Sequence, residues 1–174
     1  MKKLLNLHGL LGHANNFNYR VLKSYFADKI DIVSPQVDYL QDPNKIIEEL
    51  SDFEFDCIVA NSFGGFFGCV LSSLFKKPAI LCNPCIPPSD YILTLVPNYK
   101  YVKELERIWD SNHISSASII SILGDNDDII DPYTTAYLMH INNKPIYTVD
   151  EGHKLSSPTF EYILKYEVSK CLGI

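Results

Sequence analysis

Short apolar runs alternate along this chain with longer segments in which apolar residues recur at helical spacing. The short runs predict buried strands over residues 3–7, 31–34, 55–60, 79–82, 118–123 and 145–149. Alternating strands and helices are typical of βαβ units, in which helices cover both faces of a parallel sheet. The pattern therefore predicts an α/β fold with about six strands in a mostly parallel sheet.

The segments between these strands carry the signals of helices. Their apolar spacing predicts helices over residues 16–27, 43–50, 63–75, 132–141 and 157–171. Pro43 and Pro158 fall near the predicted starts, where proline is tolerated because the N–H that it lacks has no partner in a first turn. We expect these helices to flank the sheet.

The stretch between the fourth and fifth predicted strands is longer than an ordinary connection. Residues 84–117 hold prolines at positions 84, 87, 88 and 97, with helical patterns near Tyr91 and Tyr101. This composition predicts a short helical lid. No internal repeat or linker interrupts the chain, and residues 1–174 are therefore expected to form a single domain.

Composition and charge narrow the class of partner. Of 174 residues, 47% are hydrophobic and 12% are aromatic, which is typical of a chain with a packed core. A formal net charge of -6 opposes the electrostatic attraction on which nucleic-acid binding depends. Asn6 and His8 interrupt the apolar N-terminal run, which makes it too short for a secretion signal or a membrane span. We expect no nucleic-acid partner and no membrane partner.

The five cysteines do not suggest a disulfide framework. They are odd in number and most lie inside apolar runs, which favours reduced, buried thiols in a cytoplasmic protein. Cys82 and Cys85 form a CxxC pair, but no nearby histidine pair completes a zinc site. We therefore expect no metal at this pair.

A candidate nucleophile follows the third predicted strand. Residues 57–65 (CIVANSFGG) run from an apolar strand through Ser62 into a helical pattern. A serine on so tight a turn needs small residues two positions before and two after it, because larger side chains would collide with neighbouring backbone. Ala60 and Gly64 meet this need, although glycine is more usual at the first position. The alternative is a strand and helix packed for structural reasons alone.

The loop after the first predicted strand, residues 7–13 (LHGLLGH), is a candidate oxyanion hole. The backbone N–H groups of Leu10 and Phe63 would give two fixed donors for the charge that develops on a carbonyl oxygen in acyl transfer. His8 and His13 are expected to be turn and surface residues, since neither follows a late strand. The glycines of this loop match neither a phosphate-binding nor a dinucleotide-binding pattern.

A candidate acid and a candidate base follow the last two predicted strands. Asp127 stands three residues after Gly124 in the first of these loops, with Asp125 and Asp128 as alternatives. His153 stands in the second. The order serine, aspartate, histidine, each after its own strand, predicts a catalytic triad. The aspartates lack the glycine and the glutamate of a calcium loop, and we expect neither a metal nor a cofactor.

These motifs resemble the α/β-hydrolase superfamily and, more narrowly, the small YqiA-like bacterial esterases. The resemblance rests on residues 7–9 (LHG), 61–66 (NSFGGF), 83–88 (NPCIPP), 127–131 (DDIID) and 152–153 (GH). It implies a compact hydrolase fold that lacks the first two strands of the full sheet, with a triad of Ser62, Asp127 and His153. It also implies Leu10 and Phe63 as oxyanion donors and the hydrolysis of carboxylic esters or thioesters.

The sequence thus predicts a serine hydrolase that cleaves esters or thioesters through an acyl-enzyme intermediate. Because a protonated imidazole cannot act as a base, activity is expected to decline as the pH falls through about 6. Two alternatives remain, since a fold does not fix a function. One is a protein-binding module without activity, and the other is a hydrolase of amide or carbon–carbon bonds.

Apolar residues near the predicted site are candidate contacts for a small acyl substrate. We expect such contacts from Leu11, Ile86, Tyr91 and Leu95. The apolar side chains of the lid could instead only cover the sheet, and the sequence does not separate these two roles.

Overall fold

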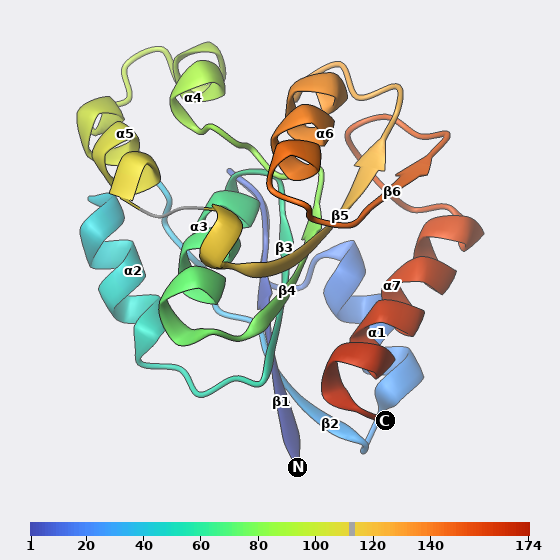
Figure 1. The fold of residues 1–174 in the computed structure, drawn as a ribbon. Helices are drawn as coiled ribbons and strands as arrows, with labels where there is room; N and C mark the ends of the chain where they lie inside the picture. Colours follow the sequence, from blue (N-terminus) through green and yellow to red (C-terminus); the bar gives the residue numbers. More distant parts are fainter. Residues whose placement is uncertain (112–113) are drawn as a thin grey trace.

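The computed structural model describes residues 1–111 and 114–174, and the fold is α/β (Figure 1). Within these residues six strands form one sheet: β1 (Lys2–Leu7), β2 (Ile30–Val33), β3 (Cys57–Asn61), β4 (Pro78–Cys82), β5 (Ser118–Gly124) and β6 (Ile146–Val149). Their order is β2-β1-β3-β4-β5-β6, and every neighbouring pair is parallel. The predicted parallel sheet is therefore confirmed.

Helices cover both faces of this sheet. Figure 1 shows α1 (Phe17–Phe26) and α7 (Pro158–Leu172) on one side of it, and α2 (Pro43–Ser51) and α3 (Ser62–Phe75) on the other. The helix α6 (Pro132–Ile141) follows β5. All of these helices lie within one residue of their predicted bounds. None of the helices in the described part of the chain is long and apolar enough to cross a membrane.

Polar side chains fix where several helices begin. Asn16 accepts from the N–H of Tyr19 before α1, and Ser157 accepts from the N–H of Phe160 before α7. Asp131 does the same for the first turn of α6. These bonds satisfy amide groups that have no partner inside the helix, which explains why the predicted starts are accurate.

The third strand begins two residues later than predicted. Phe55 is buried, but it lies outside the strand and its ring packs edge-on against Phe75 of α3, with centroids 5.5 Å apart. Asp56 then accepts from the N–H of Lys3 at 3.0 Å, and its own N–H donates to the Lys3 carbonyl at 2.8 Å. The apolar pattern thus assigned Phe55 to the strand, although Phe55 precedes it.

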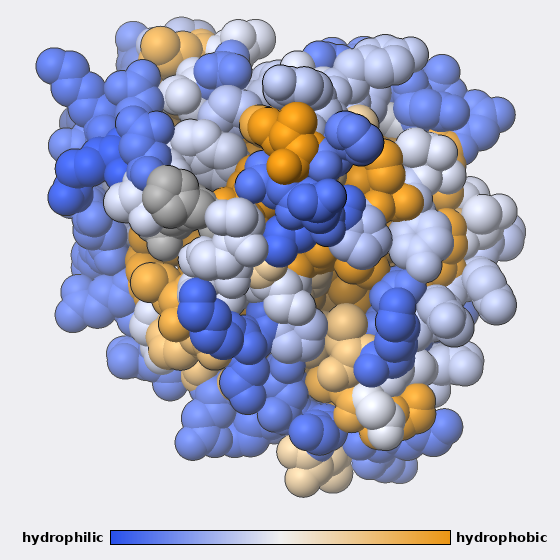
Figure 2. Space-filling view, viewed as in Figure 1, coloured by the Kyte–Doolittle hydropathy of each residue, from blue (hydrophilic) through white to orange (hydrophobic). Residues whose placement is uncertain are grey.

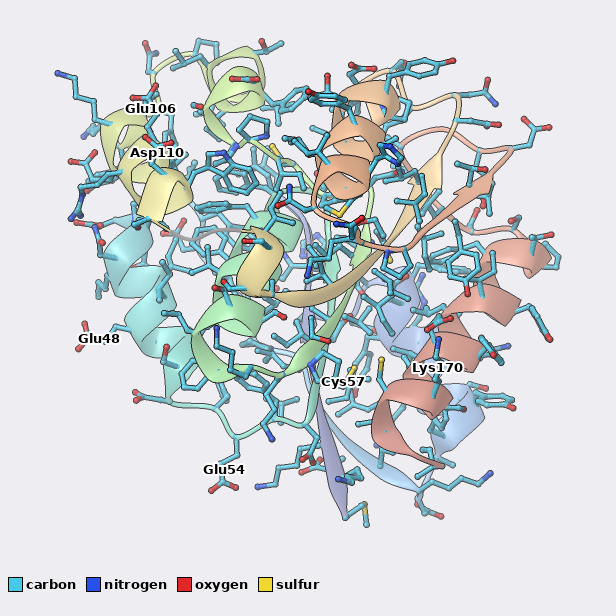
Figure 3. The ribbon with its side chains drawn as sticks, in the orientation of Figure 1. Glu48, Glu54, Cys57, Glu106, Asp110 and Lys170 are labelled. Carbon is cyan, nitrogen blue, oxygen red and sulfur yellow. The ribbon has the colours of Figure 1, made fainter. Side chains whose placement is uncertain are left out.

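The strands alternate their side chains between two apolar layers, as expected for residues that point to opposite faces of a sheet. Cys57 and Val59 of β3 pack with α1 and α7, and Figure 3 shows Cys57 between the sheet and α7. Ile58 and Ala60 of the same strand pack with α2 and α3. Both faces of the sheet are therefore buried.

The described part of residues 84–117 contains two helices, α4 (Ser89–Leu95) and α5 (Val102–Ser111), and a short 3₁₀ helix, η1 (Ile114–Ser116). Residues 112 and 113, which fall within the predicted lid, lie outside the described residues. Leu105 and Ile108 of α5 are buried in the layer that contains α2 and α3. Glu106 and Asp110 point outward (Figure 3), where hydrophilic side chains cover the outer side of α5 and α2 (Figure 2). Much of this segment therefore extends the core.

Candidate active site

Ser62 lies on the turn between β3 and α3, at the carboxyl edge of the sheet. Its φ is 49°, in the left-handed region, which is unfavourable for a residue with a Cβ. Such strain is typical of a serine held on a sharp strand-to-helix turn. The turn leaves Ser62 partly exposed, whereas Phe63 beside it is buried.

Small residues make room for this turn. A Cβ on Gly64 would overlap the carbonyl oxygen of His8, and only glycine fits there without movement. Ala60 departs from the more usual glycine, but its methyl group faces another glycine. A Cβ on Gly68 would stand 2.8 Å from the Ala60 Cβ, and the missing side chain at Gly68 therefore accommodates the alanine.

The three predicted triad residues meet at this edge of the sheet. Nε2 of His153 lies 3.0 Å from Oγ of Ser62, and Nδ1 of His153 lies 2.8 Å from Oδ2 of Asp127. The histidine side chain is 18% exposed and the aspartate side chain is 1% exposed. Loops that follow three different strands thus place a hydroxyl, an imidazole and a carboxylate in one line.

Hydrogen bonds hold the Asp127 carboxyl in its charged form. Burial opposes ionisation, but the bonds from His153 and from the backbone N–H groups of Ile130 and Ile129 outweigh it, so the pKa of Asp127 lies below its ordinary value of 3.8. The two backbone bonds are 3.0 and 2.9 Å long. An ionised Asp127 accepts from Nδ1–H of His153, which leaves Nε2 free to accept from the Ser62 hydroxyl.

Asp127, rather than either alternative, makes the contact with the histidine. Asp125 and Asp128 are exposed. Asp125 accepts from the side-chain amide of Asn126 at 3.1 Å. In the structure, Nδ1–H of His153 donates to Asp127.

His8 is buried, and our expectation that it is a surface residue was wrong. It is 1% exposed, and its Nε2 accepts from the N–H of Val37 at 2.9 Å, while Nδ1–H donates to the Gly9 carbonyl at 2.7 Å. The hydroxyl of Tyr39 also donates to the His8 carbonyl at 2.7 Å. These partners fix the backbone that leads into Gly9. His13 is exposed, as expected.

The two predicted oxyanion donors belong to backbone segments next to Ser62. A Cβ on Gly9 would stand 3.1 Å from the Cβ of Ser62, which brings the loop with Leu10 against the serine. Phe63 lies in the first turn of α3, where amide N–H groups have no partner inside the helix. Gly9, which precedes Leu10, and the first turn of α3, which contains Phe63, thus both lie next to Ser62.

The four predicted substrate contacts have different surroundings. Leu11 is 78% exposed, whereas Ile86 is 0% exposed and packs in the core, where a substrate does not reach it in this conformation. Tyr91 and Leu95 are partly exposed on α4, and burial raises the pKa of the Tyr91 hydroxyl. Ile86 fails as a contact because an apolar side chain in a proline-rich segment turned into the core.

Two residues that matter to this geometry, Gly124 and Asn83, entered the sequence analysis only as positions within motifs, without a structural role. A Cβ on Gly124 would lie 2.5 Å from the carbonyl oxygens of Glu151 and Gly152, which shows how closely the loops after β5 and β6 approach. Asn83, directly after β4, bonds both loops with its side chain. A polar residue inside an apolar stretch was the available signal for Asn83, but its partners lie far away in the sequence.

All five cysteines are free. Burial raises the pKa of the Cys69 and Cys82 thiols to about 12, which keeps them protonated at neutral pH. Across residues 1–111 and 114–174, no three side chains of the kinds that bind metals are grouped to hold an ion.

No family model matches the sequence. Solved structures do match the fold. Est1E from Butyrivibrio proteoclasticus superimposes with a TM-score of 0.75 at 11% identity, over 99% of this chain and 89% of that chain. Alpha/beta hydrolase domain-containing protein 10 from mouse gives 0.76 at 11% identity, over 98% and 89%. The esterase PF2001 from Pyrococcus furiosus gives 0.65 at 14% identity, over 99% and 81%.

These likenesses cover nearly the whole chain, and the sheet order and the helices on both faces agree with them. The narrower resemblance to YqiA-like esterases stays a prediction. The chain has the α/β-hydrolase fold.

Proposed function

We propose that this protein is a serine hydrolase that cleaves carboxylic esters or thioesters through an acyl-enzyme intermediate. One observation carries the proposal, the unbroken line of hydrogen bonds from Ser62 Oγ through the His153 ring to Asp127 Oδ2. A hydroxyl becomes a useful nucleophile when a base within hydrogen-bond reach takes its proton and a third group orients that base.

In the proposed reaction Ser62 Oγ attacks the acyl carbon while its proton passes to Nε2 of His153. Asp127 stabilises the imidazolium through the bond to Nδ1–H. The imidazolium then gives the proton to the leaving alcohol or thiol, and an ester of Ser62 remains. Water, deprotonated by the same histidine, attacks this ester and releases the carboxylic acid and the free serine.

Backbone N–H groups would stabilise the negative charge of each tetrahedral intermediate. We assign this role to Leu10, which follows Gly9 in the loop that packs against Ser62, and to Phe63, which lies in the first turn of α3. A fixed donor aimed at the developing charge contributes about a hundredfold to a thousandfold in rate. The bonds that His8 makes with Val37 and Gly9 support this loop.

The acyl group would meet a partly apolar rim. Leu11 is exposed beside the proposed donor Leu10, and Tyr91 and Leu95 are partly exposed on α4. Short or medium acyl chains suit such a rim, because apolar contacts orient a small substrate without a deep tunnel. One of the structurally similar proteins is named an esterase, which agrees with this choice of substrate class.

The proposal is tested with nitrophenyl esters of graded chain length, acyl-CoA thioesters and a nitroanilide amide. Wild type should hydrolyse esters or thioesters, and Ser62→Ala and His153→Ala should each lose about 10⁴-fold to 10⁶-fold in kcat. Ser115→Ala is the matched control and should keep full activity, because Ser115 is exposed and lies in η1, before the start of β5. Equal rates in wild type and Ser62→Ala would contradict the proposal, and a preference for the nitroanilide would change its substrate class.

A further inference from the structure

We infer that Asn83 is a positioning residue for the proposed reaction. Its side-chain amide bonds both the loop that carries His153 and the end of β5, from which the chain leads to Asp127. The inference rests on the proposed function for its kinetic consequence. Asn83 directly follows β4 and is 3% exposed.

All of the hydrogen bonds of this amide that the structure gives run to the two triad-bearing segments. Nδ2 donates to the carbonyl oxygen of His153 at 3.0 Å and to that of Gly152 at 3.2 Å. Oδ1 accepts from the N–H of Gly124 at 2.8 Å. The histidine backbone and the strand end three residues before Asp127 are therefore held by one buried side chain.

The backbone around Asn83 is strained in a way that suits this residue. Its φ is 43°, in the left-handed region, which asparagine tolerates better than most residues and glycine tolerates best. The backbone requirement alone would be met by glycine. Glycine would, however, leave the carbonyl oxygens of Gly152 and His153 and the N–H of Gly124 without this partner. The Asn83 side chain therefore makes hydrogen bonds that the backbone turn alone does not require.

The two residues that follow Asn83 contact the segment that carries the nucleophile. The N–H of Cys85 donates to the carbonyl of Ser62 at 2.9 Å. Pro84 packs where Gly65 of α3 has no side chain, since a Cβ there would lie 2.7 Å from the Pro84 Cβ. Residues 83–85 thus contact the elements that supply all three members of the proposed triad.

Further bonds tie the two late loops to each other. The N–H of Asp125 donates to the Val149 carbonyl and that of Asn126 to the Glu151 carbonyl, both at 3.0 Å. These bonds fix the loops side by side, while Asn83 bonds the carbonyl of His153 itself. Because a misplacement of about 1 Å in a reacting group can cost about a hundredfold in rate, loss of this bond should affect turnover more than substrate binding.

The test compares Asn83→Gly and Asn83→Asp with wild type. Asn83→Gly keeps the left-handed backbone and removes the amide, and Asn83→Asp keeps an acceptor for Gly124 but turns a carboxylate oxygen toward two carbonyl oxygens. Both variants should lose about 10-fold to 100-fold in kcat, with KM changed by less than about twofold. Asn143→Gly is the control, because Asn143 also has a left-handed backbone conformation, with a φ of 54°, but its side chain is exposed. It should leave both constants unchanged.

A second readout does not depend on turnover. In wild type, the proton on Nδ1 of His153 should give a downfield NMR resonance because it is bonded to Asp127. Asn83→Gly should shift or broaden this resonance, and Asn143→Gly should not. If the wild type hydrolyses none of the substrates but Asn83→Gly still alters this resonance, the positioning role is supported and the proposed function is rejected. An unaltered resonance with wild-type kcat in Asn83→Gly would overturn the inference.

Discussion

The loops that carry the proposed triad and the segment 84–117 both start at the carboxyl edge of the sheet, but different forces hold them. The triad loops depend on hydrogen bonds between side chains and backbone, such as those of Asp127 and Asn83. The segment 84–117 depends on apolar burial, with Ile92, Leu105 and Ile108 in the core. The removal of a single hydrogen-bonding side chain should therefore damage the first region and spare the second.

The largest effect is expected for Asp127→Asn. The variant keeps an oxygen for the N–H groups of Ile129 and Ile130 but presents an amide N–H to His153, which favours the wrong tautomer of the ring. We expect kcat to fall about 10⁴-fold, as removal of the acid does in other triads, with little change in fold. Steady-state kinetics and circular dichroism check the two parts separately.

Asp128→Asn is the matched control for that variant. Asp128 is exposed beside Asp127, and the same change of charge there should leave kcat within about twofold of wild type. If Asp128→Asn instead caused the larger loss, the acid of the proposed triad would have to be reassigned.

Gly124→Ala should separate the two late loops. The added Cβ would lie 2.5 Å from two backbone carbonyl oxygens, which cannot move as a side chain end can. We expect a loss of about 1–3 kcal/mol in unfolding free energy, together with lower kcat. Gly152→Ala provides the comparison, because the nearest atom to its Cβ would be 3.6 Å away. If urea titrations gave Gly124→Ala the same unfolding free energy as wild type, the close packing of the two loops would be refuted.

Stability should decrease in mild acid because of His8. Burial lowers the pKa of His8 below its ordinary value of 6.5, and nearby His13 lowers it further, although the bond to Gly9 raises it. The unfolded chain therefore binds the proton first, and the stabilisation present above pH 6.5 is lost as the pH falls toward the folded pKa. His8→Gln should flatten this part of the curve of Tm against pH, while His13→Gln should keep it.

The smallest effect concerns two buried tyrosines. Among the described residues the Tyr99 hydroxyl has no hydrogen-bond partner, whereas the Tyr39 hydroxyl donates to the His8 carbonyl. Tyr99→Phe should be neutral or stabilise the fold by about 1 kcal/mol, and Tyr39→Phe should destabilise it by about 1 kcal/mol. Denaturant titrations of both variants compare a buried hydroxyl that forms a hydrogen bond with one that does not, and equal losses of stability would contradict this distinction.

The sequence predicted the strands, the helices and the meeting of Ser62, Asp127 and His153 for the same reason. Apolar periodicity reports which segments are buried strands, and parallel strands bring their carboxyl ends to one edge. A polar residue directly after such a strand is therefore placed at that edge without knowledge of side-chain contacts. Ser62 directly follows β3, and Asp127 and His153 stand three and four residues after the ends of β5 and β6.

The sequence did not predict contacts that depend on distant partners. The sequence indicated only a turn at His8, because the N–H from which its ring accepts belongs to Val37, 29 residues later. Asn83 bonds backbone 41 to 70 residues farther along the chain. For Ile86 the residue type did not distinguish a wall of the substrate site from the core, since both are apolar. Such choices depend on packing between segments rather than on local pattern.

The central claim is that Ser62 is activated by His153, and covalent labelling tests it most directly. A fluorophosphonate probe should add to one site in wild type, and peptide mass mapping should place it on Ser62. Ser62→Ala should take up none, and His153→Ala should react far more slowly. A folded wild type that stays unlabelled, or that carries the label on another residue while Ser62→Ala labels equally well, would contradict the account.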